Sequence, residues 1–248
     1  MNRSTLGVVC LGALCLGAAA LGDVSRAAAV QSSAGLAARS SYAPIHSERV
    51  VAEKPPMDAD ELAAQEDKRE RRVQRVLARA RRFLGKRVIN IDGKRFHWDC
   101  ANYVRAAFNH VFDIMSYKNG PKTRSGVRRI WYFGKRRGGV HFRRVPLVGD
   151  LLFFHQTYDS NGNRRADDYF THIALVEKVD KDGTVTYVDR AINGIARRKM
   201  NLYYPDRAKH PRTGKVINSH VRPRRRWDRK GDGHLSGSLF AGFATVIP

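Results

Sequence analysis

The feature that most constrains the fold is a pair of β-strand patterns joined by an Asp-Gly turn. Residues 172–179 (HIALVEKV) and 184–188 (TVTYV) are rich in apolar and β-branched residues, and Asp182-Gly183 lies between them. An Asp-Gly pair in that place is typical of a hairpin turn. Apolar runs at 150–154 and 239–247 predict two further strands. The second half of the chain is therefore expected to form an antiparallel sheet.

Helical patterns precede these strands. One group of apolar residues at helical spacing predicts an amphipathic helix that ends at Gly85. Its members are Val73, Val76, Leu77, Ala80 and Leu84. A second helix is expected to begin at Cys100, because Asp99 is a good N-cap and an apolar face follows. That face holds Val104, Ala107, Phe108 and Val111. The basic stretch 118–139 is expected to form loops. Helices followed by an antiparallel sheet indicate an α+β domain.

The first 29 residues have the order of a secretory signal peptide. Asn2 and Arg3 precede an apolar run, 6–21, and the small residues 27–29 offer a cleavage site. A retained membrane helix is the alternative, but the run is short and padded with Gly and Ala. Export predicts a secreted or periplasmic protein with no transmembrane anchor after processing. Residues 30–67, rich in Ala, Ser, Glu and Pro, predict a disordered linker or propeptide, and 68–248 the folded domain.

The chain is strongly basic, with 46 Lys and Arg against 23 acidic residues and a formal net charge of +23. A field of that sign favours polyanions such as nucleic acid, acidic lipid surfaces or anionic cell-envelope polymers. A solvated basic surface without a dedicated ligand is the plain alternative. Nucleic-acid binding requires aromatic residues among the basic clusters. Only Trp131-Tyr132 beside 135–137 and Trp227 beside 224–226 meet that requirement, so nucleic acid is not an expected partner.

Cysteine usage suggests chemistry. Of three cysteines, Cys10 and Cys15 lie in the predicted signal peptide, and Cys100 is the thiol that remains. A helix start favours an anion, so a thiol at that position ionises more easily and becomes a nucleophile. His172, which opens one predicted strand, is the candidate base. Asp189, which ends the partner strand, is the candidate acid that orients the imidazole. Taken singly, such a Cys or His is more often a core or structural residue.

Four short segments resemble the NlpC-type and CHAP (cysteine, histidine-dependent amidohydrolase/peptidase) families. They are 98–104 (WDCANYV), 148–154 (VGDLLFF), 171–176 (THIALV) and the hairpin 183–188 followed by Asp189. The resemblance implies a papain-like α+β fold, with N-terminal helices packed on a small antiparallel sheet. It covers a core of about 70–190 and leaves 191–248 as a C-terminal extension that completes the sheet or forms a basic lobe.

The resemblance implies hydrolysis of amide bonds in peptidoglycan by an endopeptidase or an amidase, with peptidoglycan as the partner. The sequence departs from the family at the acid, which is usually Glu or Asn with a further Asn two residues later. Here these positions are Asp189 and Ala191. The backbone N–H of Cys100 supplies half of an oxyanion hole, and His97 or Trp98 is the candidate for the other half. Two alternatives stay open: a catalytically silent envelope-binding module, and a secreted basic protein that binds nucleic acid or lipopolysaccharide.

One acidic segment has the spacing of a calcium loop. Asp159, Asn161, Asn163 and Asp167 surround Gly162, but Arg164 stands where such loops require glycine. A polar turn is the preferred interpretation. A similar half-loop at 228–233 has less support, and the nine histidines are scattered without a ligand pair at helical spacing. The sequence therefore predicts no metal and no cofactor.

Overall fold

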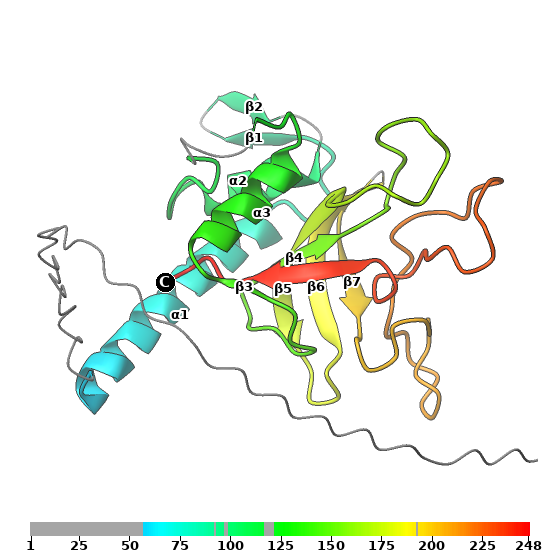
Figure 1. Cartoon of the computed structure of the whole chain (residues 1–248). Helices are drawn as coiled ribbons and strands as arrows, with labels where there is room; N and C mark the ends of the chain where they lie inside the picture. The colour runs from blue at the N-terminus through cyan, green and yellow to red at the C-terminus, as the bar shows by residue number, and fades with distance from the viewer. Residues whose placement is uncertain (1–56, 92, 97–98, 117–121, 192) are drawn as a thin grey trace, which may run out of the picture. The chain divides into compact units, whose positions relative to one another are not determined.

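The computed structural model describes residues 57–91, 93–96, 99–116, 122–191 and 193–248 (Figure 1). The predicted signal peptide, residues 1–29, and most of the predicted linker lie outside these ranges. Among the helices that the structure describes, none is long and apolar enough to cross a membrane. The described residues all belong to one unit, 55–248.

The first helix, α1 (Ala59–Arg81), begins earlier than predicted. Its N-cap is Asp58, whose side chain accepts a 2.7 Å hydrogen bond from the backbone N–H of Glu61. The boundary of the predicted linker at residue 67 is therefore wrong. Residues 59–68 are all exposed, so this part of the helix has no apolar stripe that a sequence pattern could reveal. The later turns bury the predicted face through Val73, Val76, Leu77 and Ala80.

Two more helices cover the sheet. Helix α2 (Cys100–Phe108) starts where predicted, and the Asp99 side chain accepts a 2.7 Å bond from the Asn102 N–H. Helix α3 (Gly126–Arg136) was not expected, so the prediction of loops over 118–139 is wrong for this part. Ser125 is the N-cap of α3. The buried face of this helix consists of Val127, Ile130, Trp131, Phe133 and Gly134. Basic residues on its outer face dilute this pattern in the sequence.

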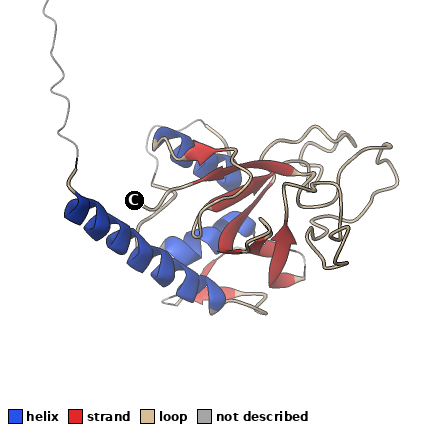
Figure 2. Ribbon diagram, turned by 90° about the horizontal axis from the view of Figure 1, so that it is seen from below, coloured by secondary structure: helices blue, strands red, loops and turns tan. Residues whose placement is uncertain are grey.

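The strands form a short hairpin and a larger sheet (Figures 1 and 2). The hairpin joins β1 (Ile89–Ile91) and β2 (Lys94–Phe96). The sheet contains β3 (Val140–His141), β4 (Leu151–Phe154), β5 (His172–Val179), β6 (Val185–Ala191), β7 (Gly194–Met200) and β8 (Phe240–Ala244). Its order is β3-β8-β4-β5-β6-β7, and every neighbouring pair is antiparallel. The α+β architecture is confirmed.

The segment predicted as a C-terminal extension is part of this sheet. Strand β7 extends the predicted hairpin at one edge, and β8 lies between β3 and β4. Residues 194–200 and 240–244 of this segment therefore complete the sheet.

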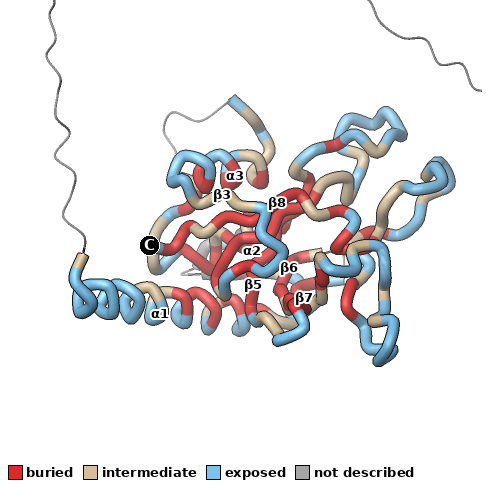
Figure 3. The backbone as a smooth tube through the Cα atoms, turned by 60° about the horizontal axis from the view of Figure 1, so that its bottom comes forward, coloured by how far each residue is buried: buried red, intermediate tan, exposed pale blue. Residues whose placement is uncertain are grey.

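Side chains that alternate along the strands build two cores, one on each face of the sheet. The three helices pack against the face that carries Phe153, Ile173 and Leu175. The other face carries Phe154, Tyr187 and Met200 and packs against Leu239 and Leu202. Figure 3 shows the buried residues concentrated in the sheet and on the inner sides of the helices. Among the described residues, the sheet thus has a hydrophobic core on each face.

The Val-Gly-Asp segment before β4 has a structural role. Gly149 has φ +89°, and a Cβ on it would lie 2.9 Å from the Val73 side chain of α1. The fully buried Asp150 carboxylate accepts bonds from the Leu147 N–H (2.8 Å), His141 Nε2 (3.0 Å) and Thr245 Oγ1 (2.7 Å). This motif therefore joins α1, β3, β4 and the end of β8, which fixes the strand that leads to the site.

Candidate active site

Cys100 is the first residue of α2 and is 9% exposed. Asp99 holds the helix start by accepting bonds from both the backbone N–H and the side-chain amide of Asn102. The free N–H groups and the dipole of the helix point toward the thiol side of this turn. The Cys100 side chain therefore lies at the N-terminal end of α2.

His172 and Asp189 are brought together by the β5–β6 pairing. His172 opens β5 opposite Phe154, and Ala174 on the same strand pairs with Asp189. The imidazole Nε2–H donates to Asp189 Oδ2 at 2.8 Å, and the Asp189 side chain is fully buried. Asp189 does not end its strand as predicted, because β6 continues to Ala191. The antiparallel register, rather than a strand end, places the carboxylate beside the ring.

The charges around His172 and its burial shift the pKa of its imidazole in opposite directions. Burial alone lowers the pKa of an imidazole, because it disfavours the charged form. The charge of Cys100 and hydrogen bonds with Asp189 and Cys100 outweigh that effect and raise the His172 pKa from 6.5 to about 10. Since Nε2 bonds Asp189, Nδ1 is the ring nitrogen that is left for the thiol. The arrangement therefore favours the imidazolium form of His172 at neutral pH.

A pocket of about 290 Å³ contains the thiol and the imidazole. Besides Asp99, Cys100 and His172, its wall contains Thr157, Tyr158, Thr171, Arg190, Ala191, Val221, Arg222 and Pro223. The last three residues are far from every motif in the sequence, so sequence reasoning missed them. A second pocket of about 250 Å³ shares Ala191 and 221–223 with the first and adds Arg198 and His220. The two pockets thus share one wall, residues 221–223, which forms the groove wall beside Cys100.

The loop between β4 and β5 supplies Tyr158, another residue that the sequence did not suggest. Burial raises the Tyr158 pKa, and the charges of Cys100 and Asp168 raise it further. Its hydroxyl therefore stays protonated and is able to donate a hydrogen bond. Two other loop residues, Gln156 (φ 56°) and Phe170 (φ 51°), occupy the left-handed region that L residues rarely adopt. Such backbone strain is common at functional sites.

Bonds between Thr157 and Thr171 hold this loop against the start of β5. The backbone N–H and the hydroxyl of Thr157 each lie 2.9 Å from Thr171 Oγ1. Thr171 directly precedes His172 in the chain. The loop that carries Tyr158 is therefore anchored beside the imidazole.

The predicted second oxyanion donors and the acidic loop are the remaining candidate site residues. His97 and Trp98, the candidates for a second oxyanion donor, lie outside the described residues. In the acidic loop, Asp159 accepts bonds from the backbone N–H groups of Gly162 and Arg164, both at 2.8 Å. This is the geometry of a polar turn. Within the described ranges, no group of three or more His, Cys, Asp or Glu side chains is arranged to hold a metal ion.

Of three comparisons with known proteins, one found a match. The CHAP domain family model matches residues 91–191, a range that contains Cys100, His172 and Asp189. This segment, less than half of the chain, resembles a CHAP domain. A search of curated proteins and a search of solved structures each found no match. CHAP domains are associated with hydrolysis in cell-wall peptidoglycan, so the match indicates a peptidoglycan-related hydrolase.

The CHAP match ends inside the sheet. Strands β7 and β8 and the pocket wall 221–223 follow residue 191 and lie outside the matched range. The segment beyond the match therefore contributes both to the sheet and to the groove beside Cys100.

Proposed function

We propose that this protein is an exported cysteine hydrolase that cleaves amide bonds in peptidoglycan, with Cys100 as nucleophile, His172 as base and Asp189 as orienting acid. One observation carries the proposal. The pocket that contains Cys100 also contains His172, whose ring is fixed by a 2.8 Å bond to the buried Asp189 and whose pKa is raised to about 10.

The proposed reaction has two halves. In the first, the Cys100 thiolate attacks the carbonyl carbon of the amide, and the resulting oxyanion is stabilised by the Cys100 N–H and the Tyr158 hydroxyl. The imidazolium of His172 then gives its proton to the leaving amine, and a thioester forms. In the second half, neutral His172 takes a proton from water, the hydroxide attacks the thioester, and the carboxylic acid leaves. The thiolate and imidazolium are restored, and no cofactor is consumed.

The basic surface is proposed to raise encounter with anionic polymers of the envelope rather than to choose the bond. Export rests on the order of charged, apolar and small residues in 1–29. Amino-terminal sequencing of the protein from culture medium or periplasm tests it. A chain that keeps residues 1–29 in the cytoplasm would contradict export without affecting the proposed chemistry.

The chemistry is tested by incubating purified protein with peptidoglycan and analysing the soluble fragments by mass spectrometry. New amino termini on the stem peptide identify an endopeptidase, and freed lactyl groups on muramic acid identify an amidase. Cys100→Ala and His172→Ala should release no fragments while circular dichroism shows that both variants remain folded at the assay temperature. His110→Ala is the matched control, because His110 is exposed and lies outside the pocket. Fragment release by a clean Cys100→Ala preparation refutes the proposal.

A further inference from the structure

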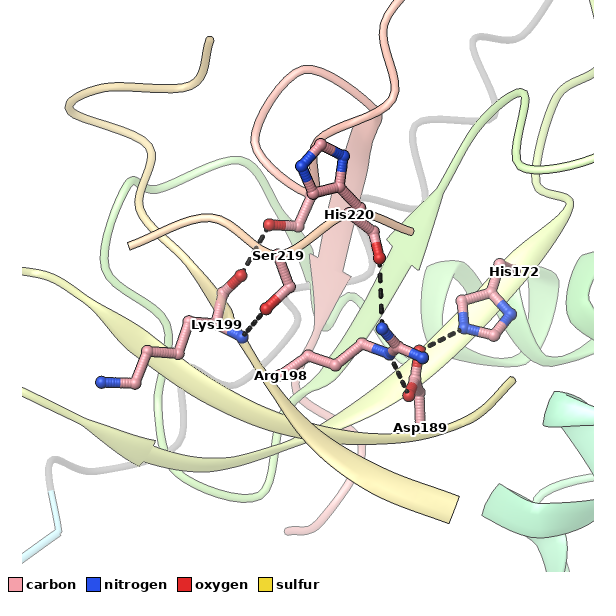
Figure 4. A network of polar contacts seen from close by, with 7 residues as sticks. His172, Asp189, Arg198, Lys199, Ser219 and His220 are labelled. Carbon is pink, nitrogen blue, oxygen red and sulfur yellow. Dashed lines mark hydrogen bonds and ion pairs between the residues drawn. The ribbon is translucent and has the colours of Figure 1, made fainter. Parts of the chain in front are cut away.

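The two oxygens of the Asp189 carboxylate have different partners. Oδ2 accepts from His172 Nε2 at 2.8 Å, and Oδ1 accepts from Arg198 Nε at 3.0 Å (Figure 4). The Asp189 side chain is fully buried, while the side chains of His172 and Arg198 are 10% and 22% exposed. The carboxylate thus lies between an imidazole on one side and a guanidinium on the other.

Arg198 reaches this place through the sheet register. On β7 it pairs with Tyr187, and Asp189 pairs with Ala196, so Arg198 and Asp189 are diagonal neighbours on adjacent strands. Diagonal neighbours lie within reach of long side chains. Arg198 follows the range matched by the CHAP family, and its strand was not predicted from the sequence. Its place beside the proposed triad comes entirely from the pairing of β6 with β7.

The guanidinium also contacts the groove wall. Arg198 Nη1 donates to the backbone carbonyl of His220 at 3.1 Å, and His220 directly precedes the wall residues 221–223. Arginine is suited to such a double contact, because its donors point in fixed directions from one plane. The same side chain therefore connects Asp189 with the segment that forms the wall.

A buried carboxylate with one partner is poorly fixed. It is free to rotate about the bond that carries it, and its second oxygen loses the hydrogen bonds that water would supply. The bond from Arg198 to Oδ1 removes that freedom and leaves Oδ2 directed at Nε2 of His172. A positive charge at this place also offsets the cost of burying the negative charge.

We infer that Arg198 is a positioning residue of the active site, which aligns Asp189 with His172 and couples that alignment to the groove wall at His220. The inference rests on the proposed function of Cys100, His172 and Asp189. The competing role for Arg198 is purely structural: a clamp between β7 and residues 219–221 whose effect does not pass through Asp189.

A double-mutant cycle separates these two roles. Its readouts are kcat and KM on soluble stem-peptide fragments of peptidoglycan, and the rate at which iodoacetamide alkylates Cys100, followed on the Cys100 peptide by mass spectrometry. Arg198→Met should lower kcat and the alkylation rate about tenfold, the size expected for one lost bond to a buried charge. KM should change little. In an Asp189→Ala background the same substitution should change both rates less than about twofold.

Lys199→Met is the matched control, because it removes a cation from the next position of β7, whose side chain points away from Asp189 (Figure 4). Both rates should match those of the wild type. If Arg198→Met fails to fold, Arg198→Lys replaces it in the cycle, since it keeps the charge and removes the planar donors.

The outcomes are distinct. Equal losses in both backgrounds, or no loss from Arg198→Met alone, overturn the positioning role. A wild-type protein whose Cys100 reacts no faster than a free thiol and which releases no peptidoglycan fragments overturns the proposed function itself.

Discussion

The titration of His172 offers a sharp test of the electrostatics of the site. Burial and charge act in opposite directions on this imidazole, and the balance raises its pKa from 6.5 to about 10. Each pKa unit corresponds to about 1.36 kcal/mol, so the site favours the imidazolium by on the order of 5 kcal/mol. Most of that free energy comes from the negative charge of Cys100 and from the Asp189 carboxylate, since burial alone acts the other way.

This shift has a defined effect on stability. The folded pKa lies above the unfolded one, so the protonated ring stabilises the folded state fully below about pH 6.5. That contribution disappears as the pH rises from 6.5 to about 10. Urea unfolding of the wild type and of His172→Gln should therefore show a difference in unfolding free energy that narrows over this window. Hydrolysis should be lost only as the pH passes the folded pKa of about 10, because the leaving amine needs the imidazolium proton.

The assay is nuclear magnetic resonance of the ring nitrogens, with His172 assigned by its absence from His172→Gln spectra. The wild-type midpoint is expected near pH 10. Cys100→Ala should lower that midpoint, because the charge of Cys100 is the largest of the effects that raise the pKa. A wild-type midpoint at or below 6.5 would mean that burial outweighs both neighbours, and the reasoning would be refuted.

Three further changes test other parts of the site. Asp189→Asn should lower kcat at least about tenfold but leave some activity, because an amide oxygen still accepts from the ring; a rate within about twofold of wild type rules out the orienting role. Tyr158→Phe should lower kcat with little change in KM, whereas Tyr169→Phe, in the same loop and 59% exposed, should change neither. Equal effects of the two would exclude Tyr158 as an oxyanion donor. Gly149→Ala should cost about 2 kcal/mol or more in urea unfolding, because a Cβ there meets an α1 valine at 2.9 Å. Gly162→Ala, with similar φ and open space around it, should cost less.

Local signals account for the parts of the fold that were predicted. Asp99 is followed by an apolar helical face, and Asp182-Gly183 lies between two β-rich runs. In each case residues close in sequence determine the element, so the start of α2 and the β5–β6 hairpin were accessible from the sequence alone. The same locality explains why Cys100 and His172 were found as candidates, although their proximity needed the structure.

The missed parts depend on contacts between distant residues. The outer arginines of α3 hid an apolar face that only the packing against the sheet makes evident. Arg198 reaches Asp189 through strand register, and the wall residues 221–223 reach the pocket through a long return of the chain. Neither arrangement produces a helical or strand periodicity that could be recognised in the sequence.

The position of β8 between β3 and β4 has a consequence for how the chain is made. Val140 of β3 and Leu151 of β4 both pair with Ala244, which follows them by about 100 residues. At 5–20 residues per second, a ribosome needs roughly 5 to 20 s to synthesise that interval. During this time the facing edges of β3 and β4 are without their shared neighbour, and an unpaired edge is a template for association between chains. Nascent chains that stall before residue 240 should therefore aggregate, whereas chains that extend past residue 244 should become soluble and resistant to protease.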